Sequence, residues 1–156
     1  MKIKLIAVGT RMPDWVDEAV EEYARRLPGD FRLEVKPVPM ARRGRNADVA
    51  KAMQQESDSL LGQIDNRDTV VVLDVEGRRH TTDSLARRMA SQQHCGSDIA
   101  LLVGGPDGLD AGCLQRADER WSLSDLTLPH PLVRVVLAEQ IYRVWTVLQG
   151  HPYHRR

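Results

Sequence analysis

The sequence predicts an α/β fold in which helices flank a parallel sheet. Two continuous apolar runs, residues 69–73 and 99–103, are typical of strands buried on both faces of such a sheet. Segments with helical spacing of apolar residues alternate with the strands, which favours right-handed strand–helix–strand crossovers. At 156 residues the chain matches a single domain, residues 1–156, that needs no disulfide or structural metal to be stable.

The first strand and helix are expected near the N-terminus. The apolar residues 3–8 predict a short buried strand. Pro13 is a favourable first helical residue, and apolar side chains then recur at helical spacing as far as Leu27. A surface helix is therefore expected here, ended by the Pro28-Gly29 pair.

The next elements flank an arginine-rich loop. Apolar and charged side chains alternate over residues 31–35, which predicts a strand with one exposed face; Pro37 ends this strand or marks it as an edge strand. Asn46 is the expected N-cap of the following helix, and Thr82 is the expected cap of the helix between the two buried strands.

Composition gives no electrostatic argument for nucleic acid, because 22 basic and 22 acidic residues leave a formal net charge of zero. The arginines nevertheless cluster locally. The candidate RNA-binding residues are Arg42, Arg43 and Arg45 in the loop and Arg155 and Arg156 at the C-terminus. Solvated surface arginines are the alternative explanation for each cluster.

The two cysteines, Cys95 and Cys113, have neither metal-site spacing nor a disulfide framework, so reduced thiols are expected. No apolar run approaches the roughly 20 residues of a membrane span, and the N-terminal segment is too short and too charged for a signal peptide. We expect a soluble, cytoplasmic protein with no metal and no membrane partner.

The glycine-rich turn at residues 104–108, Gly-Gly-Pro-Asp-Gly, follows the second buried strand. Ligands of open parallel sheets bind beyond the carboxyl ends of the strands, and glycines let the backbone approach a ligand closely. The turn lacks both the Lys-Ser/Thr ending of a phosphate-binding loop and the G-x-G-x-x-G fingerprint of dinucleotide sites. A ligand site and a plain tight turn both remain open.

Residues 122–131 alternate hydroxyl-bearing residues with leucines, and they either bind an adenine or amino-acid ligand or simply lead into the last helix. That helix is apolar over a wide arc, which favours contact with another chain. Arg134 and Arg143 interrupt the arc, and Glu139 lies one helical turn before Arg143, so an ion pair on a solvated face is one possibility.

Four motifs occur in a distinctive order and spacing: the glycine turn, residues 122–134, the Glu139-Gln-Ile-Tyr-Arg143 stretch and the tail Pro152-Tyr-His154. Further motifs lie at residues 7–10, 12–15 and 43–48. Together they resemble the RlmH family of SPOUT methyltransferases, and the resemblance covers essentially the whole chain.

The resemblance implies a SPOUT-type α/β fold with a C-terminal trefoil knot, working as a homodimer with the knots at the interface. It implies transfer of a methyl group from S-adenosylmethionine to N3 of a pseudouridine in bacterial 23S ribosomal RNA, on the assembled ribosome. Carried over by motif, the cofactor-binding residues are expected to be Leu73, Gly104, Gly105, Gly108, Leu123, Ser124, Asp125, Leu126, Thr127 and Leu128.

The catalytic candidates follow from the chemistry of this transfer. A sulfonium methyl group is already activated, so the enzyme has to position the RNA nitrogen and let its proton leave. His154 is the favoured base and Tyr153 a stacking or orienting group, if the tail folds back over the methyl group. Arg134 and Arg143 could instead stabilise the deprotonated ring without a general base.

Two other classes of function are left open. A catalytically idle RNA-binding module of the same fold would keep the arginine clusters but not bind S-adenosylmethionine. An unrelated α/β enzyme would use the glycine turn for a nucleotide, although the nucleotide fingerprints are absent. The neutral charge further predicts a composite RNA site, formed by two subunits and the ribosome.

Overall fold

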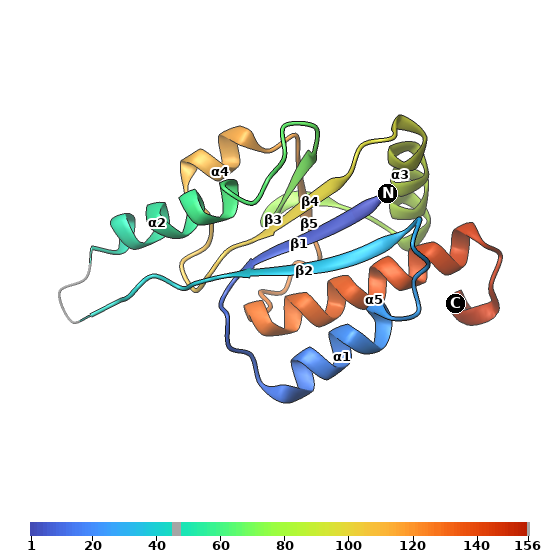
Figure 1. Cartoon of the computed structure of the whole chain (residues 1–156), viewed down its shortest axis with the longest axis horizontal. Helices are drawn as coiled ribbons and strands as arrows, with labels where there is room; N and C mark the ends of the chain where they lie inside the picture. The colour runs from blue at the N-terminus through green and yellow to red at the C-terminus, as the bar shows by residue number, and fades with distance from the viewer. Residues whose placement is uncertain (45–47, 156) are drawn as a thin grey trace.

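The computed structural model describes residues 1–44 and 48–155. This part of the chain forms a five-stranded parallel sheet with the strand order β2-β1-β4-β3-β5 (Figure 1). The strands are β1 (Lys2–Val8), β2 (Arg32–Val38), β3 (Thr69–Arg79), β4 (Ile99–Val103) and β5 (Glu119–Ser122). The predicted α/β class with a parallel sheet is confirmed.

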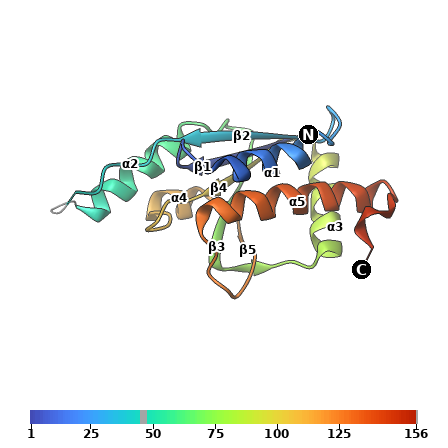
Figure 2. The ribbon, with the colours of Figure 1, turned by 90° about the horizontal axis from the view of Figure 1, so that it is seen from below.

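Helices cover both faces of the sheet (Figures 1 and 2). One face carries α1 (Asp14–Ala24), α3 (Thr82–Cys95) and α5 (His130–Leu148), and the other carries α2 (Val49–Leu61) and α4 (Ala111–Arg116). A short 3-10 helix, η1 (Pro152–His154), follows α5. Both termini lie near the C-terminal end of α5 in Figure 1.

Each central strand contributes to two hydrophobic cores, because successive side chains of a strand point to opposite faces. Leu5 of β1 and Leu101 of β4 pack against α1, α3 and α5. Ile6 and Leu102, one position later, pack against α2 and α4. The continuous apolar runs therefore do mark strands that are buried on both faces.

The helix starts differ from the predictions by one or two residues. The carboxylate of Asp48 accepts a hydrogen bond from the Lys51 amide and caps α2, so the prediction of Asn46 as the cap is wrong; Asn46 itself lies outside the described residues. Thr81 rather than Thr82 caps α3, since its hydroxyl accepts from the Ser84 amide. Pro13 is the residue before α1 rather than its first residue.

The sheet extends beyond the predicted strands. Among the described residues β2 pairs only with β1, and it contains Pro37, so its placement at a sheet edge is confirmed. β3 continues past the expected end at Leu73, because β5 provides a further partner. Leu73 and Arg78 both pair with Trp121, so residues 74–77 bulge out of the ladder.

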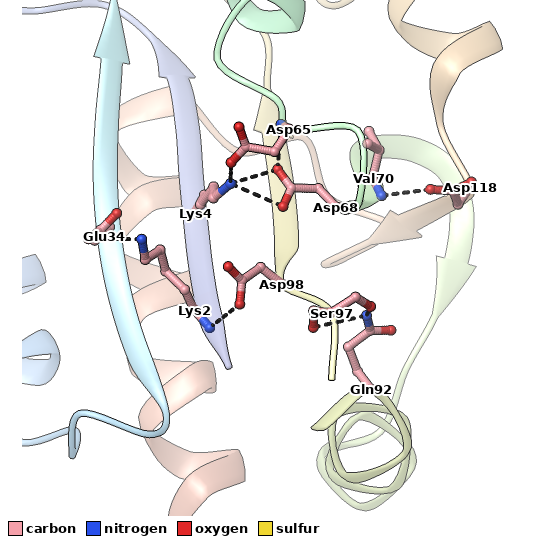
Figure 3. Close-up of polar contacts among 10 residues, drawn as sticks. All are labelled: Lys2, Lys4, Glu34, Asp65, Asp68, Val70, Gln92, Ser97, Asp98 and Asp118. Carbon is pink, nitrogen blue, oxygen red and sulfur yellow. Dashed lines mark hydrogen bonds and ion pairs between the residues drawn. The ribbon is translucent and has the colours of Figure 1, made fainter. Parts of the chain in front are cut away.

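A buried ion cluster joins β1 to the turn before β3 (Figure 3). The Lys4 side chain is 2% exposed, and its Nζ donates hydrogen bonds of 3.0 and 2.8 Å to the two Asp68 oxygens and another to Asp65. Burial disfavours the charged amine, but the hydrogen bonds to Asp65 and Asp68 outweigh it and raise the pKa of Lys4. The cluster fixes how this turn sits against the sheet.

Candidate functional site

A cavity of about 810 Å³ lies beside residues 73–75 of β3 and opens beyond the carboxyl end of β4. Its size is that of a small-molecule site. The expected cofactor residues that line it are Leu73, Gly104, Gly105, Gly108, Leu123, Ser124, Leu126, Thr127 and Leu128. Asp125 does not line it, and its carboxylate pairs with Arg79. Three segments that are separate in the sequence, and that were predicted to bind the cofactor, therefore lie together around one cavity.

The glycine turn beside this cavity has no room for side chains at its start. A β-carbon on Gly104 would lie 2.7 Å from the Gly108 carbonyl carbon. The Gly108 amide donates a 3.0 Å hydrogen bond to the Gly105 carbonyl, and Gly108 itself has a φ of 82°. Glycine is thus required both for the close approach at residue 104 and for the backbone angle at residue 108.

Glu56 of α2 supports the turn from the protein interior. Its side chain is 2% exposed, and its two oxygens accept hydrogen bonds of 2.8 Å from Nη1 and Nη2 of Arg43. Nε of Arg43 donates a further 2.7 Å hydrogen bond to Asp107 in the turn. These hydrogen bonds, first to Glu56 and then to Asp107, raise the pKa of Arg43. Arg43 is therefore already engaged by carboxylates.

At the start of α5, His130 lines the cavity and Arg134 lies one turn further on. Arg134 is buried, and its Nη2 donates to the carbonyls of Val8 at 3.1 Å and Gly9 at 2.6 Å. Burial lowers the pKa of both side chains, and the neighbouring Arg134 lowers that of His130 further. His130 was not predicted as a lining residue. Its place at a helix start, directly after Pro129, was the available signal, because such a position lies at the sheet edge where ligands bind.

The other predicted catalytic residues gather at the far end of α5. The Tyr153 hydroxyl donates a 3.1 Å hydrogen bond to Glu139, and the Tyr153 ring packs edge-on against Tyr142 with 4.7 Å between centroids. The Arg143 guanidinium lies 5.1 Å from the centre of the Tyr153 ring and also pairs with Glu139, as the one-turn spacing suggested. Burial, followed by a hydrogen bond with Tyr23 and the charge of Glu139, raises the pKa of Tyr153.

A second cavity, of about 790 Å³, lies beside this tail. It is lined by His154, Arg155, Arg143, Gln140 and Val147 and by the first residues of α3. His130 and Arg143 are 13 residues apart on one helix, which corresponds to about 20 Å along its axis. Figures 1 and 2 likewise place the tail at the C-terminal end of α5, away from the start of this helix. The expectation that the tail folds back over the cofactor segment of its own chain is therefore wrong.

The predicted RNA-binding arginines have different environments. Arg42 and Arg155 are exposed, whereas the Arg43 side chain is 21% exposed. Arg45 and Arg156 lie outside the described residues. Within residues 1–44 and 48–155, no group of three or more His, Cys, Asp or Glu side chains could hold a metal ion, and no helix is long and apolar enough to span a membrane.

Comparison with known proteins matches residues 1–154 to the family described as "Predicted SPOUT methyltransferase". Two proteins named "Ribosomal RNA large subunit methyltransferase H", from Marinomonas sp. (strain MWYL1) and Hahella chejuensis, are 54% and 55% identical over 155 residues. The alignments cover 99% of this chain and 100% and 99% of those proteins, respectively.

Solved structures of methylase family proteins share the fold. One from Neisseria gonorrhoeae has a TM-score of 0.55 at 16% identity, covering 90% of this chain and 81% of that one. Another from Haemophilus influenzae Rd KW20 has a TM-score of 0.57 at 9% identity, covering 99% and 70%.

Proposed function

Because the chain belongs to the RlmH family of SPOUT methyltransferases, we propose that it methylates N3 of a pseudouridine in 23S ribosomal RNA, with S-adenosylmethionine as the methyl donor. The observation that carries the proposal is the cavity beside residues 73–75 of β3 and the carboxyl end of β4, since its lining contains all of the expected cofactor residues except Asp125. The relatives named as ribosomal RNA methyltransferases support the choice of substrate, which would place the enzyme in the cytoplasm.

The residues of the cavity suit this cofactor. The leucines of residues 123–128 and Leu73 offer an apolar surface for the adenine ring, and the backbone of the glycine turn offers hydrogen-bonding groups without side chains in the way. When bound, S-adenosylmethionine supplies a methyl group activated by its sulfonium. The chain then has to hold that group in line with the attacking nitrogen and exclude water.

The separation of the two cavities supports a homodimer. One end of α5 carries the cofactor cavity and the other carries His154 and Tyr153, so a single chain holds the two parts of the site about a helix length apart. A second copy would supply its tail to the cavity of the first. Leu126, 73% exposed, and Val75 are apolar residues at the cavity, as expected where another chain packs. We also propose that the C-terminal part of the chain forms a trefoil knot and that the knots of the two copies lie at their interface.

Proton removal from N3 is assigned to His154 of the tail. A neutral imidazole can accept a proton at a ring nitrogen, and this side chain lines the cavity beside the tail, where an RNA base could lie next to Tyr153. The Arg143 charge is already paired with Glu139, so it is less able to stabilise a deprotonated ring. Arg134, the other arginine expected to stabilise the deprotonated ring, is likewise engaged, since it donates to two carbonyls in the interior.

Calorimetric titration with S-adenosylmethionine, followed by transfer of a radiolabelled methyl group to assembled ribosomes, tests the function. We expect one cofactor per intact cavity and methylation of 23S ribosomal RNA at a pseudouridine. Ribosome binding without cofactor binding would instead identify an idle RNA-binding module. Light scattering at micromolar concentration should give the mass of a dimer. The mass of a monomer would contradict a site that is shared between two chains.

A further inference from the structure

We propose that Arg43 is a positioning residue of the cofactor cavity, which fixes the glycine turn at residues 104–108 by joining Asp107 to Glu56. The proposal rests on the proposed function, since it assigns this turn to S-adenosylmethionine. Arg43 then positions the glycine turn instead of contacting an RNA phosphate, which is the role that its arginine-rich loop predicts.

Glu56 holds Arg43 in place from the protein interior. Its carboxylate is buried on α2 and also accepts a 3.0 Å hydrogen bond from the Ala41 amide. A β-carbon on Gly105 would lie 3.3 Å from its Oε1, so the turn rests directly on the carboxylate. A buried carboxylate needs a cation with well-defined geometry, and the two-pronged guanidinium of Arg43 provides it.

Asp107 is the residue through which Arg43 contacts the glycine turn. It sits in the turn, lines the cavity and is more exposed than Glu56. Three glycines give this turn many backbone conformations, so an outside contact is needed to hold one of them. Nε of Arg43 supplies that contact at 2.7 Å while its other nitrogens are held by Glu56.

The alternative, that Arg43 binds RNA phosphate, conflicts with these contacts. Nε, Nη1 and Nη2 all donate to carboxylates, and Nη1 also donates to the Ala41 carbonyl at 3.0 Å. A phosphate would have to displace a carboxylate. The neighbouring Arg42 is exposed and is the better candidate for phosphate contact.

The test compares Arg43→Ala, Asp107→Asn and Glu56→Gln by calorimetric titration with S-adenosylmethionine. Each variant should bind the cofactor roughly tenfold more weakly, because each weakens the hold of Arg43 on Asp107, and one hydrogen bond to a charged group is worth about this much. Arg43→Lys, which keeps the charge but not the fork, should recover only part of the affinity. Because Arg43 and Asp107 act through each other, their double variant should be no weaker than Arg43→Ala alone.

Arg32→Ala is the matched control, because it removes another arginine–glutamate pair, with Glu34 at 3.1 Å, on the exposed edge strand. Its cofactor affinity should equal that of the wild type. At saturating cofactor, Arg43→Ala should keep the wild-type KM for ribosomes and the wild-type salt dependence.

The proposal is overturned if Arg43→Ala binds S-adenosylmethionine like the wild type but shows a raised ribosome KM and a flatter salt dependence, since Arg43 would then be a phosphate contact. It is also overturned if the variants only lower the melting temperature and the folded protein binds the cofactor normally. Failure of the wild type to bind S-adenosylmethionine would instead refute the proposed function, and this assignment with it.

Discussion

Gly104 lies so close to Gly108 that a β-carbon at residue 104 would come within 2.7 Å of the Gly108 carbonyl carbon. Gly104→Val should therefore push the glycine turn into the cavity and weaken S-adenosylmethionine binding by at least about a hundredfold, or about 2.7 kcal/mol. Calorimetry measures the affinity and circular dichroism checks the fold. Gly29→Val, at a glycine with open space around it, is the control. Normal cofactor affinity in Gly104→Val would place the cofactor elsewhere.

Methyl transfer should be lost in both His154→Ala and Tyr153→Ala, with cofactor binding retained, because the tail lies away from the cavity of its own chain. Co-expression of His154→Ala with Gly104→Val, each inactive alone, should restore roughly a quarter of the wild-type activity, since half of the dimers would carry one intact site. No restoration would mean that each chain uses its own tail.

The pH dependence of transfer provides a separate check on His154. If its imidazole takes the N3 proton, the rate should fall in acid, where a protonated imidazole cannot accept that proton, and this acid limb should be absent from the residual activity of His154→Gln. A variant with the wild-type rate and pH profile would assign the proton to solvent.

Exposed arginines should govern the salt dependence of ribosome binding. Arg42→Gln and Arg155→Gln each remove a cation that faces solvent, so each should weaken binding. Each should also reduce the slope of log K against log salt by about 0.7 to 0.9 for every RNA phosphate that the variant no longer neutralises. Binding at a series of salt concentrations measures this slope. An unchanged slope in both variants would make these arginines simple surface charges.

Lys4→Met should lower the free energy of unfolding by about 3–5 kcal/mol, because it leaves the buried Asp68 carboxylate without its cation. Urea denaturation measures the loss. The double variant Lys4→Met/Asp68→Asn, which removes both charges, should regain much of it, whereas Lys2→Met on the same strand should have little effect because its partner Glu34 is 3.8 Å away and partly exposed. Equal losses in the single and double variants would show that packing, not charge, matters at this position.

Mild acid should destabilise the fold through two histidines. Burial, followed by the charge of Arg78, lowers the pKa of His80, and burial followed by Arg134 lowers that of His130. Below about pH 6.5 the unfolded chain therefore binds protons that the folded chain does not, so stability falls as the pH drops through this range. Urea midpoints at pH 7.5 and 5.5 should differ in the wild type and differ less in His80→Gln. Identical pH dependence in the two proteins would contradict this.

The sequence predicted the elements whose signal is local. Ile99–Val103 is continuously apolar, so its burial on both faces could be inferred without the fold. β5 was missed because Glu119 and Arg120 give its four residues no apolar pattern, and it exists through pairing with β3. Tertiary contacts of this kind have no signature in a single sequence.

The same limit applies to the site. Motifs located the cavity segments, but the partners of Arg43 lie 13 and 64 residues away, so its engagement by Glu56 and Asp107 could not be inferred. The tail was misplaced for a related reason. Its position depends on the edge-on packing of Tyr153 against Tyr142, which only the packed helix provides.

The bulge at residues 74–77 forms one wall of the cavity, and this wall depends on the number of residues between Leu73 and Arg78. Because Leu73 and Arg78 share Trp121 as their partner, the intervening backbone must leave the ladder, and Asp74 and Val75 consequently line the cavity. Exchanging these side chains alters the surface of that wall but not its existence. A deletion that restored a regular ladder would remove it, so the wall tolerates substitution of Asp74 and Val75 better than the loss of residues.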